Sequence, residues 1–136
     1  VRYSITETVK NLKELNHNRV REALIHLGIK NNIELSSFAS VPMRTGLGSS
    51  SSFTVALIKG LYESLGKKIS NQKVAEIACH IEIQKVGEPI GKQDQYASAL
   101  GEMNILEFKK NGSVEVKPVK LKEGVKNKFE KSLLLI

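Results

Sequence analysis

A glycine- and serine-rich segment, residues 41–52 (VPMRTGLGSSSS), has the residue types of a phosphate-binding loop. Gly46 and Gly48 allow the backbone to approach a ligand closely. The first N–H groups of a helix have no internal partners and carry a partial positive charge, so a glycine loop that runs into a serine-rich first turn forms an anion site. The serine hydroxyls add donors and one candidate Mg²⁺ ligand. The segment therefore predicts phosphate binding, and the alternative is a capped helix after a flexible loop.

Two better-known phosphate loops are excluded by the residues present. The Walker pattern requires Gly-Lys followed by Ser or Thr, and Gly91-Lys92-Gln93 does not supply it. A dinucleotide-binding fingerprint requires a third glycine, and Ser51 stands at that position. A phosphate loop of another class is therefore indicated.

Two segments together resemble the GHMP kinases, the superfamily of galactokinase, homoserine kinase and mevalonate kinase. Residues 42–50 have the pattern Pro-x-x-x-Gly-Leu-Gly-Ser-Ser of its phosphate loop. Residues 87–96 (GEPIGKQDQY) resemble the segment that carries the catalytic aspartate in galactokinase-like members. Within the superfamily, residues 80–83 (HIEI), the GKQDQY run and residues 48–55 are most similar to kinases of D-glycero-D-manno-heptose 7-phosphate. The similarity spans nearly the whole chain.

This resemblance implies transfer of the γ-phosphoryl group of ATP to the anomeric hydroxyl of that sugar. The implied cofactors are ATP and Mg²⁺, and the implied partners are ATP and a small sugar phosphate. The residues implied to bind the nucleotide are Gly46, Leu47, Gly48, Ser49, Ser50 and Ser51. By its place in the motif, Ser50 would also ligate Mg²⁺.

The resemblance also gives roles to two carboxylates. Asp94 would be the catalytic residue, because a carboxylate beside the acceptor hydroxyl can orient it and accept its proton. Glu82, twelve positions before Asp94, would be the second Mg²⁺ ligand. The alternatives are that Asp94 caps the short helix that follows it and that Glu82 is an exposed helix residue.

Apolar residues at helical spacing predict the helices that would position these residues. The first runs from Val20 to Leu27, with Asn16 or Asn18 as its N-cap and Gly28 as its stop. The others are a helix that begins in the serines and ends at Gly66, a helix that begins at Ser70 and faces the core with Val74, Ile77, Ala78 and Ile81, and a short helix after Asp94.

Four short segments have the pattern of β-strands. Ile33 and Leu35 alternate with polar neighbours, and Met103, Ile105 and residues 106–108 form a second strand pattern. Asn111-Gly112 predicts a hairpin turn into a strand at residues 114–116, and Pro118 makes that strand an edge or ends it. The apolar run 132–136 predicts a strand buried on both faces.

Composition limits the classes of protein that remain. The 136 residues, 40% of them hydrophobic and 26% charged, are enough for one soluble domain. No apolar run approaches a membrane span, and Cys79 is the single cysteine, so no membrane contact and a cytoplasmic location are expected. The net charge of +7 is spread over the chain, so a nucleic-acid partner is not expected.

The expected fold is α+β, a mixed sheet with helices packed on one side. Residues 1–136 are expected to form part of the N-terminal ATP-binding domain of a GHMP-type kinase, because the acceptor-binding N-terminal motif and the glycine-rich C-terminal motif are absent from the chain. This chain alone is therefore expected to be a poor enzyme. The alternatives are another GHMP kinase, galactokinase-like or fucokinase-like, a nucleotide-binding module without catalysis, and a nucleic-acid-binding domain.

Overall fold

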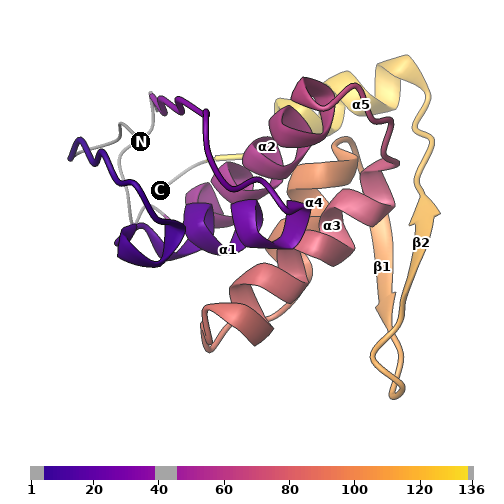
Figure 1. The fold of residues 1–136 in the computed structure, drawn as a ribbon. Helices are drawn as coiled ribbons and strands as arrows, with labels where there is room; N and C mark the ends of the chain where they lie inside the picture. The colour runs from indigo at the N-terminus through magenta and orange to yellow at the C-terminus, as the bar shows by residue number, and fades with distance from the viewer. Residues whose placement is uncertain (1–4, 39–45, 135–136) are drawn as a thin grey trace. The chain divides into compact units, whose positions relative to one another are not determined.

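The computed structural model describes residues 5–38 and 46–134, and it combines helices with one small sheet (Figure 1). Its helical and strand elements are η1 (Leu12–Glu14), α1 (Asn18–Leu27), α2 (Ser49–Ser64), α3 (Asn71–Cys79), the π-helix η2 (His80–Lys85), α4 (Gln93–Leu100), β1 (Asn104–Phe108), β2 (Val114–Pro118) and α5 (Glu123–Glu130). The predicted α+β class is confirmed. The chain divides into two compact units, Val1–Leu100 and Gly101–Ile136.

The first unit is built around helices that bury their apolar faces against one another. Helices α2, α3 and α4 contact one another in all three pairs, and α1 contacts α2 and η2. The residues predicted to face the core in the helix that begins at Ser70, namely Val74, Ile77, Ala78 and Ile81, are all buried. Helices α1 and α2 also bury apolar side chains, among them Val20, Leu24, Leu57, Ile58 and Leu61. No helix in the described ranges is both long and apolar enough to cross a membrane.

The ends of these helices follow local sequence signals, with one correction. Ser70 caps α3 by accepting a hydrogen bond from the N–H of Lys73, and Gly28 ends α1 in the left-handed conformation at φ 70°. The N-cap of α1, however, is His17 and neither Asn16 nor Asn18, because the His17 ring accepts from the N–H of Val20. Burial lowers the pKa of His17, which favours the neutral ring that this acceptor role needs.

Helix α3 continues directly into the π-helix η2, which the spacing of apolar residues does not predict. The N–H of Val86 donates to the carbonyl of Ile81 at 2.9 Å, five residues earlier. Single turns of π-helix occur frequently at functional sites, because the extra residue changes the direction of the side chains that follow. Glu82 lies in this turn and is fully buried.

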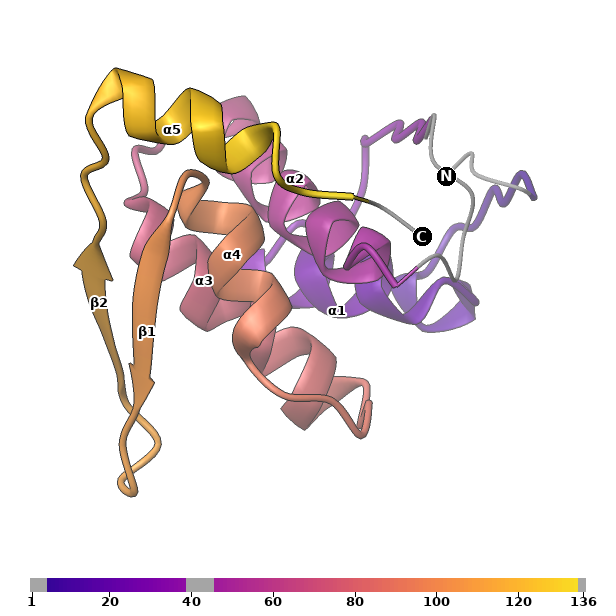
Figure 2. The ribbon, with the colours of Figure 1, turned by 180° about the vertical axis from the view of Figure 1, so that it is seen from behind.

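The second unit contains a β-hairpin (Figure 2). Strands β1 and β2 are antiparallel, with Phe108 opposite Val114 and Asn104 opposite Pro118. The predicted turn is confirmed, since Gly112 has a φ of 83° and the Asn111 side chain accepts from the N–H of Ser113. Lysine and glutamate side chains at positions 107, 109, 115 and 117 form ion pairs, two of them across the hairpin and one along each of its arms.

Two predicted strands are wrong within the described residues. Residues 33–35 form no strand, although half-buried and exposed positions still alternate there; in the described ranges the pairing beside them is limited to single bridge residues, Ser36 next to this segment and Thr6 near the N-terminus. The run from residue 132 is not a buried strand either, since Leu133 is 64% and Leu134 is 83% exposed. The sheet that the structure describes is consequently smaller than expected, two antiparallel strands. Residues 42–45 of the predicted phosphate loop and residues 135–136 lie outside the described ranges.

Candidate active site

The described part of the glycine loop runs directly into the N-terminus of α2. Gly46 and Gly48 have φ angles of 74° and 64°, which favour glycine, and Gly48 is the N-cap of α2. The N–H of Ser52 donates to the Gly48 carbonyl at 2.9 Å, but no side chain caps the helix. Within the described residues no side chain accepts from the first N–H groups of α2, and the N-terminus of a helix is a position at which proteins bind anions.

The structure places Asp94 directly against this loop. A methyl group on the Cα of Gly48 would lie 3.3 Å from Asp94 Cγ and 3.4 Å from Oδ2. The Asp94 side chain is exposed and stands in the first turn of α4, which begins at Gln93. The alternative that Asp94 is the N-cap is therefore wrong, because the residue is inside the helix. Two segments 46 positions apart in the sequence form one surface with a phosphate-type loop and a carboxylate.

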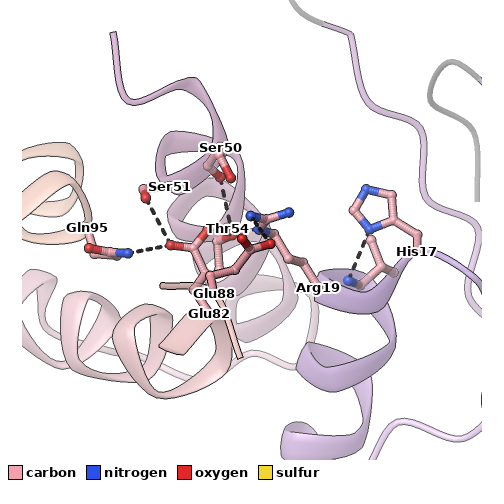
Figure 3. A network of polar contacts seen from close by, with 9 residues as sticks. His17, Arg19, Ser50, Ser51, Thr54, Glu82, Glu88 and Gln95 are labelled. Carbon is pink, nitrogen blue, oxygen red and sulfur yellow. Dashed lines mark hydrogen bonds and ion pairs between the residues drawn. The ribbon is translucent and has the colours of Figure 1, made fainter. Parts of the chain in front are cut away.

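Glu82 is the centre of a buried polar cluster (Figure 3). Its Oε1 accepts from Arg19 Nε at 3.0 Å and from Thr54 Oγ1 at 2.7 Å, and its Oε2 accepts from Ser51 Oγ at 2.9 Å and from Gln95 Nε2. The Glu82 side chain is 0% exposed, so the alternative of an exposed helix residue is wrong. We call these five residues the Glu82 cluster.

The serines at the start of α2 point in different directions. Ser51 is buried and its hydroxyl donates to Glu82, whereas Ser50 is exposed. Successive residues of a helix are not on the same face, so only one of the two can meet Glu82 directly. The Ser51 hydroxyl is turned inward, away from the role in phosphate binding that the motif implies. The roles of Ser50 and Ser51 toward a nucleotide stay predictions.

A thiol nucleophile and a preformed metal cage are not features of this surface. Cys79 is buried, and burial raises the pKa of its thiol to about 11, so the reactive thiolate is scarce near neutral pH. Among the described residues, no group of three or more His, Cys, Asp or Glu side chains is placed to hold a metal ion. A Mg²⁺ ion that is bound mainly through substrate phosphates requires only one or two protein ligands.

Three residues of the Glu82 cluster were not predicted from the sequence: Arg19, Thr54 and Gln95. A signal for two of them is present. Thr54 lies four positions before Ile58, and Gln95 lies four before Ala99, so both are polar residues on the apolar stripe of a helix. Buried polar groups need hydrogen-bond partners, so polar residues on two apolar stripes indicate a shared buried cluster.

Comparison with known proteins shows which family the chain resembles. Residues 5–102 match the family described as the GHMP kinases N terminal domain. A D-glycero-alpha-D-manno-heptose 7-phosphate kinase from Campylobacter jejuni is 34% identical over 104 residues, which are 76% of this chain and 31% of that protein. A galactokinase from Thermococcus kodakarensis is 39% identical over 62 residues, 46% of this chain and 18% of the galactokinase.

A solved structure is also similar. The crystal structure of a D-glycero-D-manno-heptose 1-phosphate kinase from Bacteroides thetaiotaomicron superposes with a TM-score of 0.78 at 28% identity, over 85% of this chain and 40% of that chain. The chain thus spans less than half the length of each of these relatives. Since the family match covers residues 5–102, both the glycine loop and Asp94 lie within it, and the chain belongs to the GHMP kinase family.

Proposed function

We propose that the protein containing this chain transfers the γ-phosphoryl group of ATP to a sugar hydroxyl, with the anomeric hydroxyl of D-glycero-D-manno-heptose 7-phosphate as the acceptor. The observation that carries the proposal is the close approach of Asp94 to Gly48, at which even an added Cβ would lie 3.3 Å from the Asp94 carboxyl carbon, so that a phosphate-type loop lies beside a carboxylate. Phosphoryl transfer depends mainly on positioning the reactants and stabilising charge, and this pair of features serves both needs. The two heptose kinases among the relatives support the acceptor class.

In the proposed reaction the acceptor oxygen forms a bond to the γ-phosphorus while the bond from that phosphorus to the leaving ADP oxygen breaks. Asp94 orients the acceptor hydroxyl and takes its proton, and its exposed side chain is accessible to a sugar. An anomeric hydroxyl is more acidic than an ordinary alcohol, so orientation is the larger part of this role. Backbone N–H groups of Gly46, Leu47, Gly48 and Ser49 hold the phosphates at the start of α2.

Mg²⁺ bound with the ATP phosphates would neutralise charge on the transferred group. Ser50 fits a direct ligand, because it is exposed in the first turn of α2. Glu82 fits less simply, because its two oxygens already accept four hydrogen bonds, which fills the acceptor positions of a carboxylate. Ligation by Glu82 therefore requires that one of these donors be released.

The proposed metal ligands can be tested by Ser50→Ala and Glu82→Gln in the intact protein. Loss of a ligand is expected to raise the Mg²⁺ concentration needed for half-maximal turnover by roughly tenfold or more. Ser50→Ala is the cleaner variant, because Ser50 is exposed and Glu82 is buried. Thermal melting of both variants separates a change in Mg²⁺ requirement from a loss of fold. If Ser50→Ala keeps the parental Mg²⁺ dependence, Ser50 is not a Mg²⁺ ligand. If Glu82→Gln has a lowered Tm and an unchanged Mg²⁺ dependence, the role of Glu82 is structural.

The acceptor is tested by offering the intact protein a panel of sugars and sugar phosphates. The heptose 7-phosphate is expected to be preferred by about 100-fold or more in kcat/KM, because a site that binds a substrate's polar groups rejects analogues that lack them. Galactose is the second candidate, since the galactokinase relative matches 46% of the chain. A preference for galactose, fucose or mevalonate moves the protein to another branch of the family and leaves the phosphate-loop argument intact.

A further inference from the structure

We propose that Gln95 is a positioning residue, which acts through Glu82 to fix the catalytic Asp94 relative to the phosphate loop. The inference rests on the proposed function, because it concerns the placement of its reacting groups. Gln95 follows Asp94 directly in α4, yet Gln95 is fully buried and Asp94 is exposed. The first turn of α4 therefore exposes the catalytic Asp94 side chain and, through the neighbouring Gln95, contacts the interior of the unit.

The inward contact connects α4 to the helix that carries the phosphate loop. Gln95 Nε2 donates to Glu82 Oε2, the same oxygen that accepts from Ser51 Oγ at 2.9 Å. Thr54 Oγ1 donates to the other oxygen at 2.7 Å. Ser51 and Thr54 both belong to α2, so one buried carboxylate joins α2 and α4 (Figure 3).

This connection runs beside the contact of Gly48 with Asp94. Ser51 lies three positions after Gly48, and Gln95 lies one position after Asp94. An α-helix has about 3.6 residues per turn. Glu82 therefore joins α2 and α4 within about one helical turn of Gly48 and of Asp94. A change in the Glu82 link shifts the Asp94 carboxylate relative to the Gly48 backbone.

The orientation of the Gln95 amide shows which of its ends is used. As a carboxylate paired with Arg19, Glu82 only accepts hydrogen bonds, so the NH₂ group of Gln95 must face it. Gln95 Oε1 then points away and is buried without a hydrogen-bond partner among the described residues. A buried amide with one end unsatisfied costs folding free energy that an apolar side chain of the same size would not. The hydrogen bond to Glu82 is thus what glutamine at position 95 provides and an apolar side chain of the same size cannot.

The loop that leads into α4 is fixed by the same cluster. Arg19 Nη2 donates to Glu88 Oε1 at 2.9 Å while Arg19 Nε donates to Glu82, and the N–H of Glu88 donates to the Glu82 carbonyl at 2.9 Å. Glu88 lies six residues before Asp94. Glu82 is therefore bonded both to the loop before α4 and to the first turn of α4. These bonds restrict movement of α4, and with it movement of Asp94.

The test is Gln95→Met in the intact protein, because methionine has a similar volume and no donor. The expected result is a kcat lowered by roughly 10- to 100-fold with the KM for ATP within about threefold of the parental value, since a misplacement of about 1 Å at the reacting groups has an effect of this size. Turnover is counted per bound ATP so that partial unfolding does not imitate the effect. The matched control is Ser98→Ala, which removes a second side-chain link between α2 and α4, the 3.0 Å hydrogen bond between Ser98 Oγ and Ser52 Oγ. This variant is expected to keep the parental kcat.

Two further measurements keep the proposal falsifiable. If Gln95→Met does not fold, Thr54→Val removes a bond to Glu82 from the α2 side at nearly constant volume and is expected to lower kcat in the same way. Hydrogen exchange in peptides covering residues 86–96 is expected to be faster in Gln95→Met than in Ser98→Ala, and this readout does not depend on turnover. A parental protein without kinase activity rejects the proposed function, whereas an active parent with unchanged kcat and exchange in Gln95→Met rejects the positioning role alone.

Discussion

Replacement of Asp94 by asparagine is expected to lower turnover of the intact protein by roughly 10²-fold or more, the scale of general acid–base catalysis. Asparagine has nearly the same size and keeps the contact with Gly48, but it cannot accept a proton. ATP affinity is expected to stay near the parental value, because the backbone N–H groups at the start of α2 are unchanged. Steady-state kinetics beside ATP titration measure the two quantities separately.

The structure supplies a matched control for this variant. Asp94 lies in the first turn of α4, where a negative charge contributes about 0.3–1 kcal/mol through the helix dipole. Glu123 is likewise an exposed acid in the first turn of a helix, α5, in the other unit of the chain. Glu123→Gln should show a similar small loss of stability with full turnover. Near-parental turnover in Asp94→Asn would refute the catalytic role. If the parental protein itself shows no turnover, a nucleotide-binding module without catalysis is favoured.

Gly48→Val is expected to weaken ATP binding by roughly 10- to 100-fold and to lower turnover further. A charge-assisted hydrogen bond to phosphate is worth about 1.5–3 kcal/mol, and a side chain at Gly48 blocks the close approach on which such bonds depend. The same side chain would meet the Asp94 carboxylate, since even its Cβ would lie 3.3 Å from Asp94 Cγ. Binding and catalysis are thus expected to fall together, which calorimetric ATP titration and turnover can show.

Backbone strain has to be separated from the loss of phosphate contacts. Gly48 has a φ of 64°, where a β-branched residue costs about 1–3 kcal/mol. Gly66 has a φ of 66° just beyond the other end of α2, and apart from its chain neighbours no described residue has an atom within 4 Å of the position of its added Cβ. Gly66→Val is therefore expected to lose comparable stability while ATP affinity stays parental. If a folded Gly48→Val variant binds ATP as the parent does, the loop is not the phosphate site.

The helices could be predicted because their signals are local. Ser70 caps α3 through its own hydroxyl, and Gly28 ends α1 because its positive φ suits glycine. His17 as a cap could not be predicted in the same way, since histidine has no strong preference for that position and its neutral ring depends on burial by the fold. The strand expected at residues 33–35 is wrong for a similar reason, because a strand exists only with a paired neighbour and the pattern of one segment does not supply it.

The candidate site was predictable in outline. Gly48 and Asp94 were identified separately by the motifs they resemble, and the structure adds that the Asp94 side chain lies close to the Gly48 backbone. Glu82 was expected to be a Mg²⁺ ligand, with an exposed helix residue as the alternative, and its burial was not predicted, although it lies four positions after Ala78 on the stripe that faces the core. Its partners Arg19 and Gln95 come from α1 and α4, so their meeting depends on tertiary packing that no local pattern contains.

The Glu82 cluster also has a thermodynamic consequence. One carboxylate accepts hydrogen bonds from α1, α2 and α4, so the loss of any one donor changes the electrostatic environment of the others. Free energies of unfolding measured for single substitutions at Arg19, Thr54 and Gln95 will therefore not be additive, and the coupling between each pair is the informative quantity. Because of this coupling, α1, α2 and α4 are expected to unfold as one cooperative unit. Local unfolding of any one of them would remove a hydrogen-bond donor from the buried Glu82 carboxylate.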